Sequence, residues 1–234
     1  MKHLFRWTLA LAASAILFSC DVEDPGPRQD STEEYGIIDF DRLEMGSGFN
    51  ITVEQGNTFL IRAEGDRRNI NDLDVYKSGN TLVIEYDEQQ DRKHQTYITI
   101  QLPVLRSVIF SGGSVSVISG FESDEDLDVH LSGGSLAQLD AGYKDLNVVL
   151  SGGSTLKMHG LGDYLSADIS GASLLSGFDY PVRHADVNLS GASSARLTVS
   201  DHLKVTASGA SSVLYRGNPL ITKTLSGESS VHSD

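Results

Sequence analysis

The 234-residue chain contains a single cysteine, Cys20, which lies near the N-terminus. The sequence after it therefore has no thiol for a disulfide, a thiolate metal site or a cysteine nucleophile. Positive charge is also scarce, because 18 Lys and Arg stand against 32 Asp and Glu and leave a formal net charge of -14. This balance disfavours nucleic acid and anionic lipid headgroups as partners.

A helical apolar period is missing as well. From residue 105 onwards, no stretch of about ten residues repeats its apolar side chains every 3.6 positions, as an amphipathic helix would. This absence disfavours helix-containing solenoids such as leucine-rich repeats.

The N-terminal segment has the pattern of a secretory signal. Two basic residues precede an apolar run over residues 7–18, which is too short to span a bilayer. The run ends in "LFSC", which resembles the lipobox of bacterial lipoproteins. The resemblance implies that residues 1–19 are removed as a signal peptide and that Cys20 carries a diacylglycerol and a further acyl chain such as palmitate. The alternative is a secreted protein without lipid whose signal happens to end near a cysteine.

Residues 20–36 are predicted to be a flexible acidic tether, because they are rich in Asp, Glu, Pro and Gly and poor in large apolar side chains. Asp21, Glu23 and Asp24 resemble the export signal that sends lipoproteins to the outer leaflet in one Gram-negative phylum. We therefore expect an outer-membrane lipoprotein of the cell envelope, held to the membrane by the lipid on Cys20 and displayed at the cell surface. Tethers of this kind are also commonly acidic without such a signal.

A Ser-Gly marker recurs every 18 to 21 residues in the C-terminal part of the chain. The marker serines are Ser111, Ser132, Ser151, Ser170, Ser190, Ser208 and Ser226. Seven phased copies indicate a solenoid. Apolar side chains alternate with polar or small ones before and after each marker, which predicts two strands per copy joined by a turn. The sequence thus predicts an all-β fold, with a right-handed parallel β-helix of about seven coils over residues 105–234.

Each marker begins a Ser-Gly-small-Ser tetrapeptide that predicts a tight corner of the coil. Glycine in the second place can adopt a positive φ, and a small third residue is expected to keep stacked corners from colliding. The closing serine shares the parity of the inward apolar positions, so we expect an interior ladder of hydrogen-bonded hydroxyls. The predicted structural corner residues are Gly112, Gly133, Gly152, Gly171, Gly191, Gly209 and Gly227, with Ser114, Ser135, Ser154, Ser173, Ser193, Ser211 and Ser229.

Residues 37–104 lack the Ser-Gly marker but also alternate apolar and polar side chains. Gly56-Asn57 and Gly79-Asn80 each suit a two-residue hairpin turn. We therefore predict a hairpin-rich β part that caps the solenoid, with one helical turn within residues 65–74. Residues 37–234 would form one continuous domain.

Three segments together with the serial corners suggest a family: "FDRLEMGSGFNITVEQG", "LDVYKSGNTLVIEY" and "ITIQLPVLRSVIFSGGSVSV". In order and spacing they resemble the head GIN domain, a "putative auto-transporter adhesin" family, over residues 38–234. The resemblance implies a β-helix-like fold in lipid-anchored envelope proteins. It supplies no catalytic residues.

Signals for catalysis or cofactor binding are weak. No marker serine lies in G-x-S-x-G, and the histidines occupy different phases of the repeat, so no serine has a recurrent base. "SGGS" lacks the lysine and spacing of phosphate-binding loops. We predict no catalytic, cofactor-binding or metal-ligating residues. Residues 122–128 contain Glu122, Asp124 and Asp126 as a conceivable Ca²⁺ site, but without the glycine and spacing of an EF-hand they favour a solvated loop.

These observations favour a non-enzymatic binding or adhesin-like protein whose wet strand face contacts a glycan, a host surface or another envelope protein. Two alternatives stay open: a polysaccharide lyase or hydrolase on a β-helix, and a purely structural envelope component. A deep groove with clustered carboxylates and Arg or Lys would favour the enzyme, whereas a flat polar face would favour binding. Self-association at the last coil, "LSGESSVHSD", is a further expectation.

Overall fold

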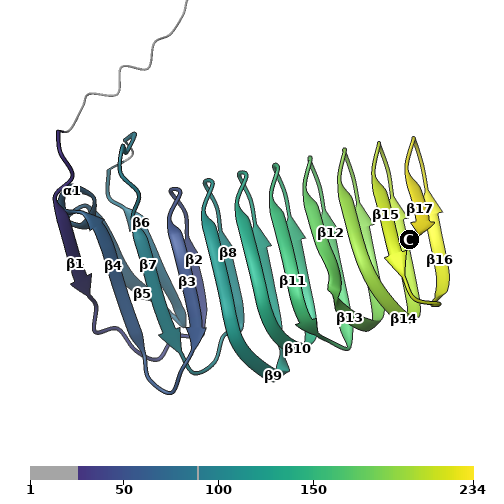
Figure 1. Cartoon of the computed structure of the whole chain (residues 1–234), viewed down its shortest axis with the longest axis horizontal. Helices are drawn as coiled ribbons and strands as arrows, with labels where there is room; N and C mark the ends of the chain where they lie inside the picture. Colours follow the sequence, from purple (N-terminus) through teal and green to yellow (C-terminus); the bar gives the residue numbers. More distant parts are fainter. Residues whose placement is uncertain (1–25, 89) are drawn as a thin grey trace, which may run out of the picture.

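The computed structural model describes residues 26–88 and 90–234, so the predicted signal peptide, Cys20 and the first part of the tether lie outside the described residues. Strands make up 64% of the chain and helix 2%, and the strands coil into a solenoid of about seven turns (Figure 1). The prediction of an all-β fold with a parallel solenoid is confirmed. Among the described residues, no helix has the length and apolar character needed to cross a bilayer.

Seventeen strands and one short helix follow each other along the chain. They are β1 (Asp30–Glu34), β2 (Arg42–Met45), β3 (Asn50–Gln55), β4 (Leu60–Asp66), α1 (Arg67–Ile70), β5 (Leu73–Ser78), β6 (Thr81–Tyr86), β7 (Tyr97–Leu102), β8 (Ser107–Phe110), β9 (Val115–Leu131), β10 (Leu136–Leu150), β11 (Thr155–Leu161), β12 (Tyr164–Ile169), β13 (Leu174–Leu189), β14 (Ser194–Ala207), β15 (Ser212–Arg216), β16 (Leu220–Leu225) and β17 (Ser230–Ser233).

Each coil consists of a strand that leads into a Ser-Gly corner and a strand that leaves it. The corners lie along the upper edge in Figure 1, and the broad return bends, where long strands such as β9 and β10 turn, lie along the lower edge. Neighbouring coils pair in parallel and in register, so that Val148 of β10 lies between Val129 of β9 and Ala167 of β12. The parallel stacking follows from the constant phase of the repeat.

The core runs the length of the solenoid as stacked columns of apolar side chains. One such column contains Val108, Val129, Val148, Ala167, Val187 and Val205, all of which are buried. Because successive side chains of a strand point to opposite faces, the alternation in the sequence places every second residue in this core. The other residues of each strand face solvent.

The solenoid begins earlier than the predicted residue 105. Strand β2 pairs in parallel with β8, and β3 pairs in parallel with β9, so residues 42–55 form a coil of their own. Its corner is Gly46-Ser47-Gly48, and a Cβ atom on Gly112 of the next corner would lie 2.8 Å from the Ser47 amide nitrogen. The predicted boundary was wrong because this corner lacks the Ser-Gly-small-Ser marker.

Residues 56–106 are an insertion between this first coil and the next. Gly79-Asn80 joins β5 and β6 as a two-residue hairpin, and the helical turn α1 lies where the sequence predicts it. The hairpin predicted at Gly56-Asn57 is wrong, because β7 separates β3 from β4. The insertion lies at the N-terminal end of the stack and covers it (Figure 1).

The predicted tether also differs from the structure. Strand β1 pairs antiparallel with β4, so residues 30–34 belong to the sheet rather than to a flexible segment. This strand is mostly exposed, and its sequence "DSTEE" has no apolar side chain that would predict a strand. A charged edge strand of this kind discourages pairing with other chains.

Candidate functional site

The second-place glycines of all seven Ser-Gly corners adopt a positive φ, between 63° and 79°. They also lie directly on the corner of the preceding coil. A Cβ atom on Gly191 would come within 2.6 Å of the Gly171 carbonyl oxygen, and one on Gly209 within 2.6 Å of the Gly191 carbonyl oxygen. Both the backbone conformation and the close approach require glycine.

The third place of the corner has a different role from the predicted one. A Cβ atom at Gly113, Gly134 or Gly153 would meet nothing within 4 Å, so small size is not needed to keep stacked corners apart. Gly113 and Gly134 have positive φ, 77° and 83°, whereas the later third-place residues do not. Glycine is therefore required in the first two corners by conformation, and alanine suffices afterwards.

The later corners are held to one another through this third residue. The amide nitrogen of Ala192 donates to the Gly171 carbonyl, that of Ala210 to the Gly191 carbonyl, and that of Glu228 to the Gly209 carbonyl, each at 2.8 Å. The side chain of the third residue is exposed. Glu228 consequently fits the last corner without disturbing it.

The closing serines lie inside the solenoid, where six are buried and Ser229 is half-buried. Six of their hydroxyls donate to the carbonyl of the marker serine three residues earlier, at 2.6 to 2.8 Å. The Ser173 hydroxyl accepts from the Ser154 amide at 3.3 Å. Because these hydroxyls have backbone partners, the geometry assigns them to the corner rather than to nucleophilic chemistry.

The return bends of β9, β10 and the β11–β12 connection enclose a shallow depression of about 610 Å³. Its polar lining includes Glu122, Asp124, Lys144 and Asp163. Residues 122–128, predicted to be a solvated loop, are largely exposed but belong to β9. Within residues 26–88 and 90–234, no group of three or more His, Cys, Asp or Glu is arranged to hold a metal ion.

Two tyrosines beneath these bends are structural. The Tyr143 hydroxyl donates to the Leu105 carbonyl at 3.0 Å, and the Tyr180 hydroxyl lies 3.3 Å from both the amide nitrogen and the carbonyl oxygen of Tyr143. Burial raises the pKa of Tyr180 to about 12, and burial together with Tyr180 raises the pKa of Tyr143 above its ordinary value. Both hydroxyls therefore stay protonated at neutral pH and cannot act there as phenolate bases.

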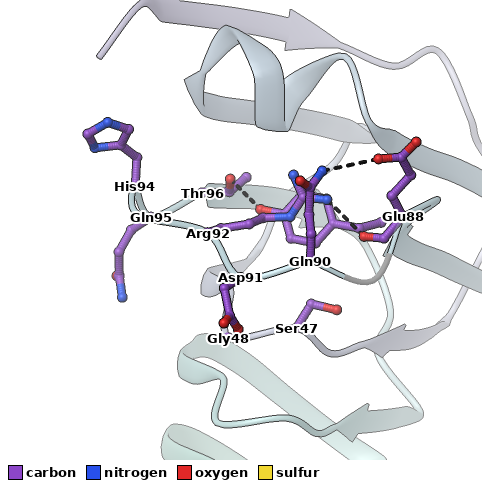
Figure 2. Close-up of a pocket in the computed structure, with 10 residues that line it drawn as sticks. Ser47, Gly48, Glu88, Gln90, Asp91, Arg92, His94, Gln95 and Thr96 are labelled. Atoms are coloured by element: carbon purple, nitrogen blue, oxygen red, sulfur yellow. Dashed lines mark hydrogen bonds between the residues drawn. The ribbon is translucent and has the colours of Figure 1, made fainter. Parts of the chain in front are cut away.

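A second depression, of about 320 Å³, lies between the first corner and the segment that joins β6 to β7 (Figure 2). The Arg92 guanidinium lies 3.5 Å above the Tyr86 ring, contacts Asp72 and donates to the Asn69 side chain at 3.2 Å. Figure 2 shows His94 pointing away from the other labelled side chains. These polar groups fasten the connecting segment and do not converge on a common point in the depression.

The two solvent-facing sides of the coils differ in charge. On the strands that lead into the corners, five outward positions are aspartates: Asp126, Asp128, Asp145, Asp168 and Asp186. We call this side the acidic face. Lys204 is its one cation between β9 and β14, and it pairs with Asp186 at 2.6 Å.

The strands that leave the corners carry two outward columns beside the corner edge. One consists of Asn50, Val115, Leu136, Thr155, Leu174, Ser194, Ser212 and Ser230, and the other of Thr52, Val117, Gln138, Lys157, Ser176, Arg196, Leu214 and His232. We call these two columns the carboxylate-free face, because none of their residues is Asp or Glu. A depression of about 420 Å³ lies near its C-terminal end.

The fold has counterparts among solved structures. A "putative adhesin" from Bacteroides fragilis NCTC 9343 is 19% identical with a TM-score of 0.77, and the match covers 88% of this chain and 97% of that one. A "putative lipid binding protein" from Parabacteroides distasonis ATCC 8503 is 18% identical with a TM-score of 0.72, covering 88% and 96%. A "putative adhesin" from Parabacteroides merdae ATCC 43184 is 16% identical with a TM-score of 0.70, also covering 88% and 96%.

No curated protein matches the chain in sequence. The family model described as "Putative auto-transporter adhesin, head GIN domain" matches residues 39–219, which include the first coil, the insertion and all but the last corner. The serial corners, the insertion and this match lead to one assignment: the chain belongs to the head GIN domain family.

Proposed function

We propose that the protein is a lipid-anchored, surface-displayed binding protein with an adhesin-like, non-enzymatic role. The observation that carries the proposal is the architecture of the solvent-exposed sides. Parallel strands present long solvent-exposed faces of polar side chains with some apolar ones such as Val115 and Leu136, and the closing-serine hydroxyls of the corners are bonded to backbone. The family description and the names of the structural neighbours agree with such a role.

The polysaccharide-acting enzyme is less well supported. Such an enzyme needs convergent carboxylates in a groove that holds the scissile bond. Of the depressions lined by carboxylates, one is shallow and another contains side chains that already hold neighbouring segments. In a third, lined by Glu44 and Glu85, the Glu85 carboxylate already accepts from the Tyr76 hydroxyl. We therefore assign the wet faces to binding rather than to hydrolysis or elimination.

One experiment separates these functions. The purified protein is incubated with an immobilised panel of bacterial and host polysaccharides, and both retention of the protein and release of soluble sugar are measured. We expect retention on at least one polysaccharide and no release from any. Release of oligosaccharides would overturn the non-enzymatic assignment, and lack of retention on every glycan and every envelope fraction would overturn the binding role.

The anchor is tested separately in a bacterial host that processes lipoproteins. We expect labelled palmitate to be incorporated into the wild-type protein and not into a Cys20→Ala variant, which would be released from the membrane fraction. Protease treatment of intact cells should digest the domain of the wild-type protein. A fully protected domain would contradict display at the cell surface.

A further inference from the structure

We infer that the carboxylate-free face binds an anionic polysaccharide, with Lys157 and Arg196 as its charged contacts. The inference rests on the proposed function, because it names the ligand class and the location for the binding role.

Charge distinguishes this face from the rest of the molecule. The chain carries a formal net charge of -14, yet the 16 outward positions of the two columns contain no carboxylate, whereas the acidic face of the same coils carries five aspartates. Salt screens exposed charges beyond about 8 Å at physiological ionic strength. A ligand lying on this face is therefore screened from the acidic face on the other side of the coils, and the carboxylate that comes next along the same strands, Asp140, already accepts from Gln138 and contacts His159.

The two cations are available to a ligand. Lys157 and Arg196 are exposed, and neither side chain has a hydrogen bond or an ion pair with another described residue. By contrast, Lys204 on the acidic face is paired with Asp186 and Arg216 with Asp234. An unpaired guanidinium can bind a carboxylate or sulfate with two hydrogen bonds, and it loses no internal partner when it does so.

The spacing of the cations matches a repeating anion. Lys157 and Arg196 lie in one column with Ser176 between them, and His232 continues this column two coils further on. With about 4.8 Å between adjacent strands, cations two coils apart are about 10 Å apart. This distance is comparable with the disaccharide repeat of an extended polysaccharide, so the anionic groups on every second sugar of a polyuronate could contact the two cations in succession.

The surface around Arg196 suits sugar rather than peptide. The depression near Arg196 is lined by Leu174, Ser194, Ser212 and Leu214, and the hydroxyls of Ser194 and Ser212 lie 3.1 Å apart. These groups offer hydrogen bonds to sugar hydroxyls and apolar contact to sugar C–H groups. The strands β9 to β15 are paired on both sides, so they leave no backbone edge to which an extended peptide could add.

The test uses the purified protein and two versions of one probe, an oligogalacturonate of defined length and the same oligomer with its carboxylates methyl-esterified. The test variant is Lys157→Gln/Arg196→Gln. The matched control is Lys144→Gln/Lys223→Gln, which makes the same change in net charge at exposed cations that also lack a side-chain partner among the described residues. Calorimetry measures affinity, and thermal unfolding verifies that both variants are folded.

We expect the wild type and the control to bind the acidic oligomer within twofold of each other, and the test variant to bind it about tenfold more weakly, as two exposed charge pairs predict. Binding should weaken on esterification and with added salt.

Equal losses in both variants, or equal binding of the esterified oligomer, would overturn the inference. The inference would also be overturned if the protein bound no polyuronate or sulfated glycan but was retained on neutral glycans or envelope proteins. That outcome would leave the proposed function intact. If the protein were retained on no glycan and no envelope fraction, both the inference and the proposed function would be overturned. If the wild type bound no glycan but self-associated, and Lys157→Gln/Arg196→Gln abolished this self-association, the face would be assigned to a second copy of the chain instead.

Discussion

The coils and the N-terminal insertion share one apolar core but differ in the polar interactions that accompany it. The coils rely on buried apolar columns, glycine corners and uncharged serine ladders. The insertion shares the apolar core, in which Ile61, Ile84 and Ile98 are buried, and adds charged contacts. Arg92 stacks on Tyr86 and contacts Asp72, and the buried Asp66 accepts from Arg68. The repeated part should accordingly be sensitive to shape and the insertion to pH, and four predictions test this contrast.

The largest effect is expected in the corners. Gly191→Val forces a β-branched residue into φ near 75° and its Cβ atom against the Gly171 carbonyl, so we expect a loss of about 3 kcal/mol in the free energy of unfolding. The control is Ala192→Val at the exposed third place, where the loss should stay below about 0.5 kcal/mol. Denaturant unfolding measures both. Similar losses in the two variants would show that the corners are not limited by shape.

The insertion should respond to pH through Asp66. Its side chain caps α1. The Arg68 guanidinium that donates to the Asp66 carboxylate, together with the Gln29 and Arg68 amides, holds the pKa of Asp66 well below the ordinary value. Asp66→Asn should lower stability by about 1 to 2 kcal/mol at pH 7.

The sign of this pH dependence follows from the lowered pKa. The contribution of Asp66 is fully present above the unfolded pKa of about 3.9, and it decreases as the pH falls below that value towards the folded pKa. Wild type and Asp66→Asn should therefore converge in stability at acidic pH, whereas the exposed Glu54→Gln should differ little from wild type throughout. A stability gap that is constant between pH 7 and pH 3 would refute the assignment.

A finer contrast exists among the corners themselves. Gly134→Ala places alanine at φ 83° and should cost about 1 kcal/mol. Gly153→Ala lies in open space without a positive φ, so it should be neutral or stabilising by about 0.5 kcal/mol, because it restricts the unfolded chain. Differential scanning calorimetry compares the two, and equal transition temperatures would argue against two kinds of corner.

The smallest effect is expected for an exposed ion pair on the coils. Lys204→Gln removes the contact with Asp186 and should change the free energy of unfolding by no more than about 0.5 kcal/mol, with the change reduced further by salt. A loss as large as that of Asp66→Asn would show that charge stabilises the coils as strongly as it stabilises the insertion.

The sequence predicts the repeated part well and the insertion poorly, for a physical reason. In the coils, the same local geometry recurs seven times, so Gly133 and Ser154 can be interpreted from their equivalents in other copies. The coil at residues 42–55 was missed because Gly46-Ser47-Gly48 is a single variant corner, and β1 was missed because an exposed edge strand needs no apolar residues. The pairing of β7 between β3 and β4 depends on long-range contacts that no local pattern encodes.

The candidate binding face was predicted only in general terms. Alternation shows that Lys157 and Arg196 point outward, but it does not show that they share a column or lack partners, since both facts depend on the register between coils. The roles of the third-place residues were wrong for a similar reason: the sequence shows that they are small but not which φ they adopt. Cys20 and its lipid stay predictions.

The in-register stacking of nearly identical coils has a consequence for how such a protein changes over generations. A coil contacts only its neighbours, so duplication of one coil would insert about 20 residues and leave every existing contact type intact, as in other repeat proteins. Each duplication would lengthen the carboxylate-free face by about 4.8 Å. On a long polymer, an added contact site raises avidity without any improvement in the existing contact sites. The number of coils would therefore set the strength of binding.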